Sequence, residues 1–139
     1  MDRDSSAKGH RRTRNDHAAE TAEDYVEAIA TLLEERGVCR VVHLAEHFGV
    51  THVTVVKILN RLRKSGLVQL RPQAPIQLTA SGRALARRSK ERHETVYRFL
   101  LAIGVPERVA AEDAEGIEHH VSDATMARFR KIARSKGTR

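Results

Sequence analysis

The chain has 139 residues, with 25 Lys or Arg against 18 Asp or Glu, and a net charge of +7 at neutral pH. This length suits one domain or two very small ones, and no apolar run is long enough to span a membrane. Cys39 is the single cysteine, which excludes an internal disulfide and a zinc site made of several thiolates. No signal-peptide pattern follows Met1, so we expect a cytoplasmic protein.

The first half of the chain opens with a polar stretch. Residues 1–19 carry charges of both signs and show no apolar periodicity, which predicts a disordered tail. From Thr21 onward apolar residues recur at helical spacing until Gly37, which predicts a first helix that ends at this glycine.

Two shorter helices and a hairpin are expected next. A β-branched run over 38–42 leads into a short helix over 43–48, and Gly49 marks a turn before a helix that Thr51 caps and that runs to about Lys64. Short strand-like runs over 67–71 and 76–79 flank a proline-containing tip. Two helices around a glycine turn, followed by a hairpin, predict a winged helix-turn-helix.

The second half predicts helices alone. A long helix over 81–102 is followed by helices over about 106–120 and 122–134. The fold class is therefore mainly α, an N-terminal winged helix-turn-helix followed by an all-helical dimerisation domain. The expected organisation is a tail over 1–19, a DNA-binding domain over 20–80 and a helical metal-binding and dimerisation domain over 81–139.

A homodimer is expected because the helical half is too small to cover all of its apolar side chains internally. These side chains lie on, or directly after, the long helix and the helix that follows it: Val96, Phe99, Leu100, Ile103, Val109, Ile117 and Val121.

Charge is segregated along the chain, with no Asp or Glu between His47 and Lys90. A basic segment without carboxylates suits double-stranded DNA, because neutralised phosphates release condensed counterions. An ordinary solvated helix face is the alternative, but such faces usually mix both signs. The candidate DNA contacts are the polar residues of the third helix and one residue of the hairpin: Thr51, His52, Thr54, Lys57, Arg61, Lys64 and Arg71.

Carboxylates gather with histidine near the end of the chain. Glu115, Glu118 and His119 have i, i+3, i+4 spacing, which places them on one helix face where a divalent cation could bind. By spacing alone, an exposed acidic helix turn is an equally good interpretation. Asp24 and Glu27 also have i, i+3 spacing, but Thr21 and Asp24 together look locally more like a capping box.

Three motifs resemble a known family when taken together. Glu23-Asp24-Tyr25-Val26-Glu27, Arg92-His93-Glu94 and Asp113-Ala114-Glu115-Gly116-Ile117-Glu118-His119-His120 resemble the manganese transport regulators, a branch of the diphtheria toxin repressor family, over residues 20–134. This resemblance implies metal ligands at Asp24, Glu27, His93, Glu115, Glu118 and His119, for one or two Mn(II) ions per subunit. It replaces the local interpretation of Asp24 as a capping residue.

The resemblance also implies a metal choice and a function. Iron-responsive relatives carry sulfur at the positions of Asp24 and Glu118, and hard oxygen ligands with imidazole suit Mn(II). The implied function is a metal-dependent repressor of manganese uptake genes that binds operator DNA as a homodimer, without a membrane partner. Two alternatives remain open: a winged-helix regulator that senses an organic ligand, and, less favoured, a dimetal carboxylate enzyme.

Overall fold

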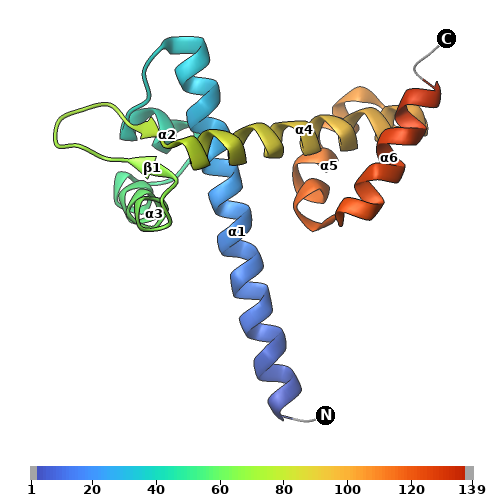
Figure 1. The fold of residues 1–139 in the computed structure, drawn as a ribbon, viewed down its shortest axis with the longest axis horizontal. Coiled ribbons are helices and arrows are strands. Elements are labelled where there is room, and N and C mark those ends of the chain that lie inside the picture. Colours follow the sequence, from blue (N-terminus) through green and yellow to red (C-terminus); the bar gives the residue numbers. More distant parts are fainter. Residues whose placement is uncertain (1–2, 137–139) are drawn as a thin grey trace. The chain divides into compact units, whose positions relative to one another are not determined.

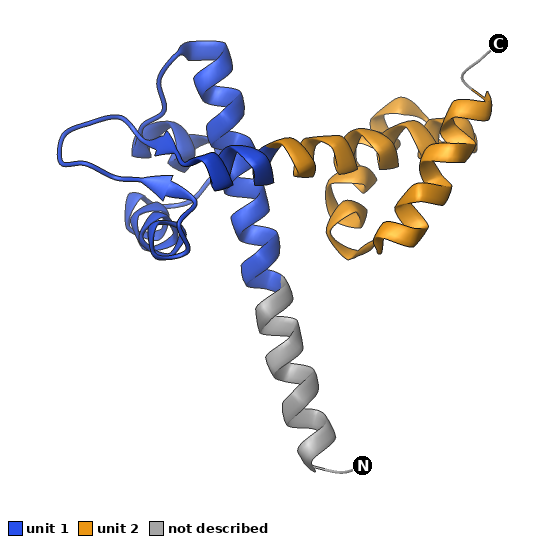
Figure 2. Cartoon of the chain, in the orientation of Figure 1, with its two compact units in different colours: residues 1–86 blue, residues 87–139 orange. Residues whose placement is uncertain are grey.

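The computed structural model describes the backbone of residues 3–136 and the side chains of residues 17–136. The chain divides into two compact units, residues 1–86 (unit 1) and 87–139 (unit 2) (Figure 2). The described part is mainly helical, as predicted, and none of its helices is both long and apolar enough to cross a membrane. In chain order the elements are α1 (Arg3–Arg36), α2 (Val41–Phe48), α3 (His52–Lys64), β1 (Val68–Gln69), β2 (Gln77–Leu78), α4 (Ala80–Ala102), α5 (Glu107–Ile117), the 3₁₀ turn η1 (Glu118–His120) and α6 (Asp123–Lys136) (Figure 1).

The structure differs from the sequence prediction at the N-terminus. The first helix begins at Arg3 rather than near Thr21, so residues 3–19 are helical rather than irregular. Within it, the Thr21 hydroxyl donates to the carbonyl of His17 at 2.8 Å, as a helix-interior threonine does. Thr21 therefore caps no helix, and the capping-box interpretation of Thr21 and Asp24 is wrong. No proline lies in this stretch, so nothing in its backbone chemistry prevents the helix from beginning well before residue 21.

The helix-turn-helix is confirmed at its predicted turn. Gly49 ends α2 with φ +64°, a left-handed conformation that glycine adopts without steric cost. Thr51 then caps α3, because its hydroxyl oxygen accepts the backbone N–H of Thr54 at 3.2 Å. The helix before the turn begins at Val41, two residues earlier than the predicted start at 43.

The hairpin is confirmed but its strands are shorter than predicted. Only two residues of each strand pair, antiparallel, with Val68 opposite Leu78. Pro72 and Pro75 cannot donate to a ladder, which keeps the tip irregular. The residue just before β2 also contacts the segment before α2, since the Ile76 N–H donates to the Cys39 carbonyl at 2.9 Å.

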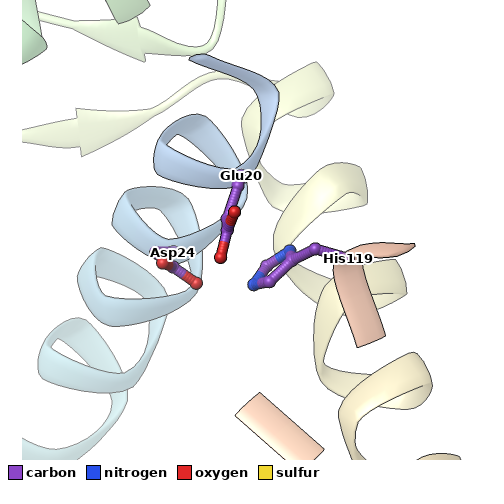
Figure 3. Close-up of side chains that lie close together, drawn as sticks. All are labelled: Glu20, Asp24 and His119. Carbon is purple, nitrogen blue, oxygen red and sulfur yellow. The ribbon is translucent and has the colours of Figure 1, made fainter. Parts of the chain in front are cut away.

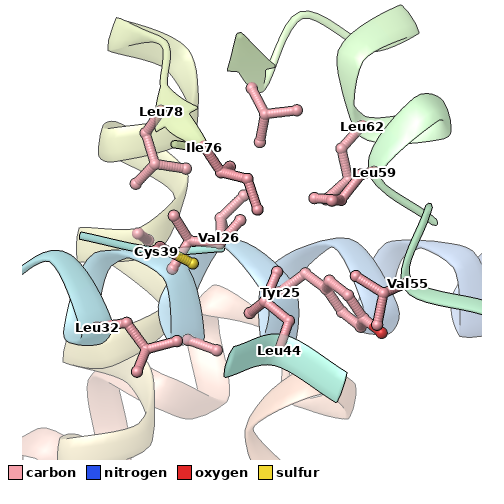
Figure 4. Packing of buried hydrophobic residues seen from close by; sticks show 14 of the residues in the cluster. Tyr25, Val26, Leu32, Cys39, Leu44, Val55, Leu59, Leu62, Ile76 and Leu78 are labelled. Atoms are coloured by element: carbon pink, nitrogen blue, oxygen red, sulfur yellow. The ribbon is translucent and has the colours of Figure 1, made fainter. Parts of the chain in front are cut away.

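One hydrophobic core holds unit 1 together. Side chains from α1, α2, α3 and the hairpin meet in it (Figure 4), so the long helix fixes the position of the helix-turn-helix. Its most buried members include Val26, Ile29, Cys39, Leu44 and Val55, each 0% exposed. At its edge the rings of Tyr25 and Phe48 stack with centroids 4.3 Å apart.

Unit 2 has a smaller core between α4, α5 and α6. Val96, Leu100, Ala110, Ala114 and Met126 are buried there. The rings of Phe99 and Phe129 stack beside them, with centroids 3.9 Å apart. Val96 and Leu100, which were expected at a dimer interface, are thus buried inside unit 2 instead. Ile103, Val109 and Ile117 remain 53%, 44% and 37% exposed.

Candidate metal centre and nucleic-acid interface

The exposed side of α3 forms a surface free of carboxylates. Val55, Leu59 and Leu62 point into the core. This orientation leaves the opposite face of the helix to solvent. The seven candidate DNA contacts all lie on exposed positions, six on α3 or at its cap and one in the hairpin: Thr51, His52, Thr54, Lys57, Arg61, Lys64 and Arg71.

Two apolar residues on the same helix were missed by the sequence prediction. Val53 is 63% exposed and Val56 is 45% exposed, although both look like core residues by composition. Only their position around the helix, on a different face from Val55 and Leu59, could have shown that they lie outside the core. Exposed methyl groups on a recognition helix can contact the C5-methyl of thymine.

Carboxylates of unit 1 line one side of α1. Asp24 and Glu27 lie three residues apart and are both half-buried. Glu20 lies one turn before Asp24, and carboxylate oxygens of these two residues approach within 4.8 Å; Figure 3 shows both side chains on α1. Glu20 was not among the predicted ligands, although its i, i+4 spacing places it beside Asp24 on one face of α1.

A buried carboxylate is the centre of the candidate metal site in unit 2. Glu118 is only 3% exposed, and an imidazole nitrogen faces each of its oxygens. His93 Nδ1, from α4, lies 3.5 Å from Oε2, and His119 Nε2 lies 3.4 Å from Oε1. A buried carboxylate is costly unless cations or hydrogen-bond donors surround it. One carboxylate and two imidazoles, all possible metal ligands, thus lie close together within unit 2.

The predicted common helix face of Glu115, Glu118 and His119 is not formed. The α-helix ends at Ile117 and tightens into η1, so Glu118 and His119 belong to a 3₁₀ turn. Glu115 stays exposed on α5, whereas the His119 side chain is only 2% exposed. The prediction from α-helical spacing was wrong here, because it assumed an unbroken helix through His120.

The donor set fits a hard divalent cation. The candidates offer carboxylate oxygens and imidazole nitrogens, a combination that suits Mn(II). The one thiol of the chain plays no part, because Cys39 is buried in the core of unit 1 and burial raises the pKa of its thiol from 9.0 to about 11. A softer thiolate ligand is therefore not offered by this chain.

Comparisons with known proteins match both halves of the chain to domains of one family. Residues 17–74 match the N-terminal DNA-binding domain of the iron dependent repressors, and residues 79–135 match their metal-binding and dimerisation domain. The transcriptional regulator MntR of Escherichia coli O6:H1 is 43% identical over 132 residues, which are 95% of this chain and 85% of that protein. The HTH-type transcriptional regulator MntR of Bacillus subtilis is 39% identical over 100 residues, 72% of this chain and 70% of that protein.

Solved structures give the same result. A manganese-dependent transcriptional repressor in complex with manganese matches with a TM-score of 0.71 and 33% identity, and the manganese regulator SloR matches with 0.72 and 29%. The match covers 85% and 81% of this chain respectively, and the chain spans about half the length of either protein, 53% in both cases. Regulators of this kind are repressors rather than enzymes, so neither the enzyme nor the sensor of an organic ligand is favoured. The chain belongs to the iron-dependent repressor family, in its branch of manganese transport regulators, and is a metal-dependent DNA-binding repressor.

Proposed function

We propose that the chain senses Mn(II) through six ligands: Asp24, Glu27, His93, Glu115, Glu118 and His119. The observation that carries the proposal is the buried Glu118 carboxylate, with one imidazole on each side at 3.4 and 3.5 Å. Six ligands suffice for one ion and could be shared between two, with carboxylates as bridges. A bound cation supplies positive charge that offsets the mutual repulsion of these carboxylates.

The ligands come from both units of the chain. Asp24 and Glu27 belong to unit 1, which carries the recognition helix, whereas His93, Glu115, Glu118 and His119 belong to unit 2. A cation held by both sets would couple the DNA-binding unit to the dimerisation unit. Metal would then favour the DNA-competent arrangement in proportion to its differential affinity for that arrangement.

A homodimer is the proposed DNA-binding form. Among the exposed apolar side chains of unit 2, Ile103, Val109 and Ile117 are available for a contact with a second copy. A hollow of about 540 Å³ beside Ile117 and Val121 adds apolar surface to this side of α5. Two recognition helices related by twofold symmetry would then meet successive major grooves, about 34 Å apart.

The operator is proposed to control manganese uptake genes, as the resemblance to manganese transport regulators implies. Repression of manganese uptake genes by Mn(II) forms a negative feedback loop, since a rising Mn(II) concentration then stops further import. Such a regulator acts where the chromosome is, so we place it in the cytoplasm.

The proposal is tested by measuring the affinity of the purified chain for its own promoter region, with Mn(II) and with EDTA. We expect tighter binding with Mn(II), by about 5- to 150-fold if the coupling has the usual size of 1–3 kcal/mol. Equal affinities would contradict metal dependence. Sedimentation in the same two buffers tests the dimer, and a monomer at micromolar concentration in both would exclude it.

A further inference from the structure

The 3₁₀ turn that carries two of the candidate ligands is held by one arginine. Arg92, on α4, donates from Nη2 to the main-chain carbonyls of Glu118, at 3.1 Å, and of Val121. Its Nη1 donates to the Asp123 carboxylate at 2.9 Å. One guanidinium therefore joins the last turn of η1 to the start of α6.

These contacts answer a need of the local fold. The last carbonyls of a helix have no partner within it, and η1 ends at His120. A cation at this end of a helix also opposes the partial negative charge of the carbonyls. Arg92 satisfies one of these carbonyls, that of Glu118, and also the Val121 carbonyl just beyond the turn, with a side chain that is only 21% exposed. Lysine could not do the same, because it lacks the planar fork that reaches several acceptors at once.

Neighbouring residues of α4 hold Glu118 at both of its ends. Arg92 binds its main-chain carbonyl, and His93, the next residue, faces its carboxylate at 3.5 Å. The orientation of the Glu118 side chain is thus tied to a guanidinium that touches no candidate ligand atom. Groups of this kind outside the ligand set often change metal affinity 10- to 100-fold when they are removed.

We propose that Arg92 is a positioning residue of the metal centre, which fixes the turn of Glu118 and His119 before metal binds. This inference rests on the proposed function, since it assumes that these two residues bind the cation. The carbonyl contacts matter most, because Asp123 is fully exposed and an exposed ion pair contributes little.

The experiment compares the full chain with Arg92→Lys, Arg92→Met and Asp123→Asn. Arg98→Lys is the matched control, because Arg98 lies on the same helix, is 68% exposed and pairs only with Glu94 in the contacts described for it. Mn(II) affinity and stoichiometry are measured by electron paramagnetic resonance of the free ion, at a temperature where circular dichroism shows each variant folded. Amide hydrogen exchange of residues 118–121 is measured in EDTA.

We expect both Arg92 variants to bind Mn(II) about 10- to 100-fold more weakly, with an altered spectrum of the bound ion and faster exchange in the turn. Asp123→Asn and Arg98→Lys should stay within about threefold of the parent. A merely structural role would lower the unfolding midpoint and leave the affinity of the folded protein unchanged, and this outcome would overturn the inference. Unchanged exchange in Arg92→Lys would overturn it as well.

The same measurements distinguish failure of the proposed function from failure of the inference about Arg92. If the parent chain binds no Mn(II), the sensing proposal is wrong, whereas the exchange measurement still decides whether Arg92 holds the turn. If Arg92→Met does not fold, Arg92→Lys, which keeps the charge and the aliphatic stem, decides the affinity.

Discussion

Replacing Gly82 with alanine tests how the hairpin and α4 are joined in unit 1. Gly82 lies in the first turn of α4, and a Cβ added there would lie 2.0 Å from the carbonyl oxygen of Leu67 and 3.2 Å from Cδ2 of Leu78. Non-bonded heavy atoms pack at about 3.5–4.0 Å, so the backbone would have to move by more than about 1 Å. The obstacle is main chain and cannot rotate away.

The displaced carbonyl is also a hydrogen-bond acceptor. It accepts the Thr79 N–H at 3.0 Å, and the Thr79 hydroxyl both donates to the Gly66 carbonyl at 2.6 Å and accepts the Gly82 N–H at 3.0 Å. Overpacking costs about 1–3 kcal/mol and a lost hydrogen bond about 1 kcal/mol, against about 1 kcal/mol gained in helix propensity. We expect a net loss of about 1–3 kcal/mol in the free energy of unfolding.

Urea unfolding of the full chain in EDTA, followed by far-UV circular dichroism, measures this loss without a contribution from bound metal. Gly116→Ala is the control, because the same change in α5 meets no heavy atom within 4 Å and should raise stability by up to about 1 kcal/mol. A Gly82→Ala variant as stable as the parent would refute the reasoning. It would mean that the main chain where β1 meets α4 can shift by more than about 1 Å without lowering the free energy of unfolding.

Three further predictions concern DNA, metal choice and pH. Lys57→Ala and Arg61→Ala should each weaken binding to operator DNA and lower the salt slope by about 1, without changing Mn(II) affinity; an unchanged slope in anisotropy titrations would place the DNA surface elsewhere. Asp24→Met combined with Glu118→Cys should reduce activation of DNA binding by Mn(II) more than by anaerobic Fe(II), because Mn(II) forms the weakest complexes of the series and depends most on anionic oxygen; a parental preference for Mn(II) would show that these positions do not govern selectivity. Burial raises the pKa of Cys39 from 9.0 to about 11, so the folded chain keeps a proton that the unfolded chain loses in this range, and stability should fall as pH rises from about 9 to 11. A Cys39→Ala variant should lack this part of the decline, and an identical pH dependence would contradict the assignment.

The sequence predicted those parts of the fold whose ends carry local chemical signals. Thr51 and Gly49 mark the start of α3 and the end of α2 by hydrogen bonding and backbone conformation alone, and both were found where expected. The ends that lack such signals were misplaced. Nothing in the backbone chemistry stops α1 at residue 21, and the change from α5 to η1 after Ile117 has no proline or capping residue to announce it.

The candidate site was predictable only in part, because its contacts are long-range. Local spacing placed His93 in no cluster of candidate ligands, and only the family resemblance added it to the ligand set. The structure supplies a physical reason, the 3.5 Å approach of His93 to Glu118 across 25 residues of sequence, from position 93 to 118. The burial of Glu118 and the three acceptors of Arg92 have no sequence signature, since both arise from the packing of α4 against η1 and α6.

These contacts bear on how metal binding could reach the DNA surface. If Arg92 and His93 already hold Glu118 in the absence of metal, little binding energy is consumed in ordering the turn. The remaining energy would then be available to engage the proposed ligands Asp24 and Glu27 on α1, which shares a hydrophobic core with α3. Linkage makes this quantitative: the factor by which Mn(II) tightens DNA binding must equal the factor by which DNA tightens Mn(II) binding. A turn loosened at Arg92 should therefore lower Mn(II) affinity in free and DNA-bound protein alike, whereas loss of Asp24 should lower the coupling factor itself.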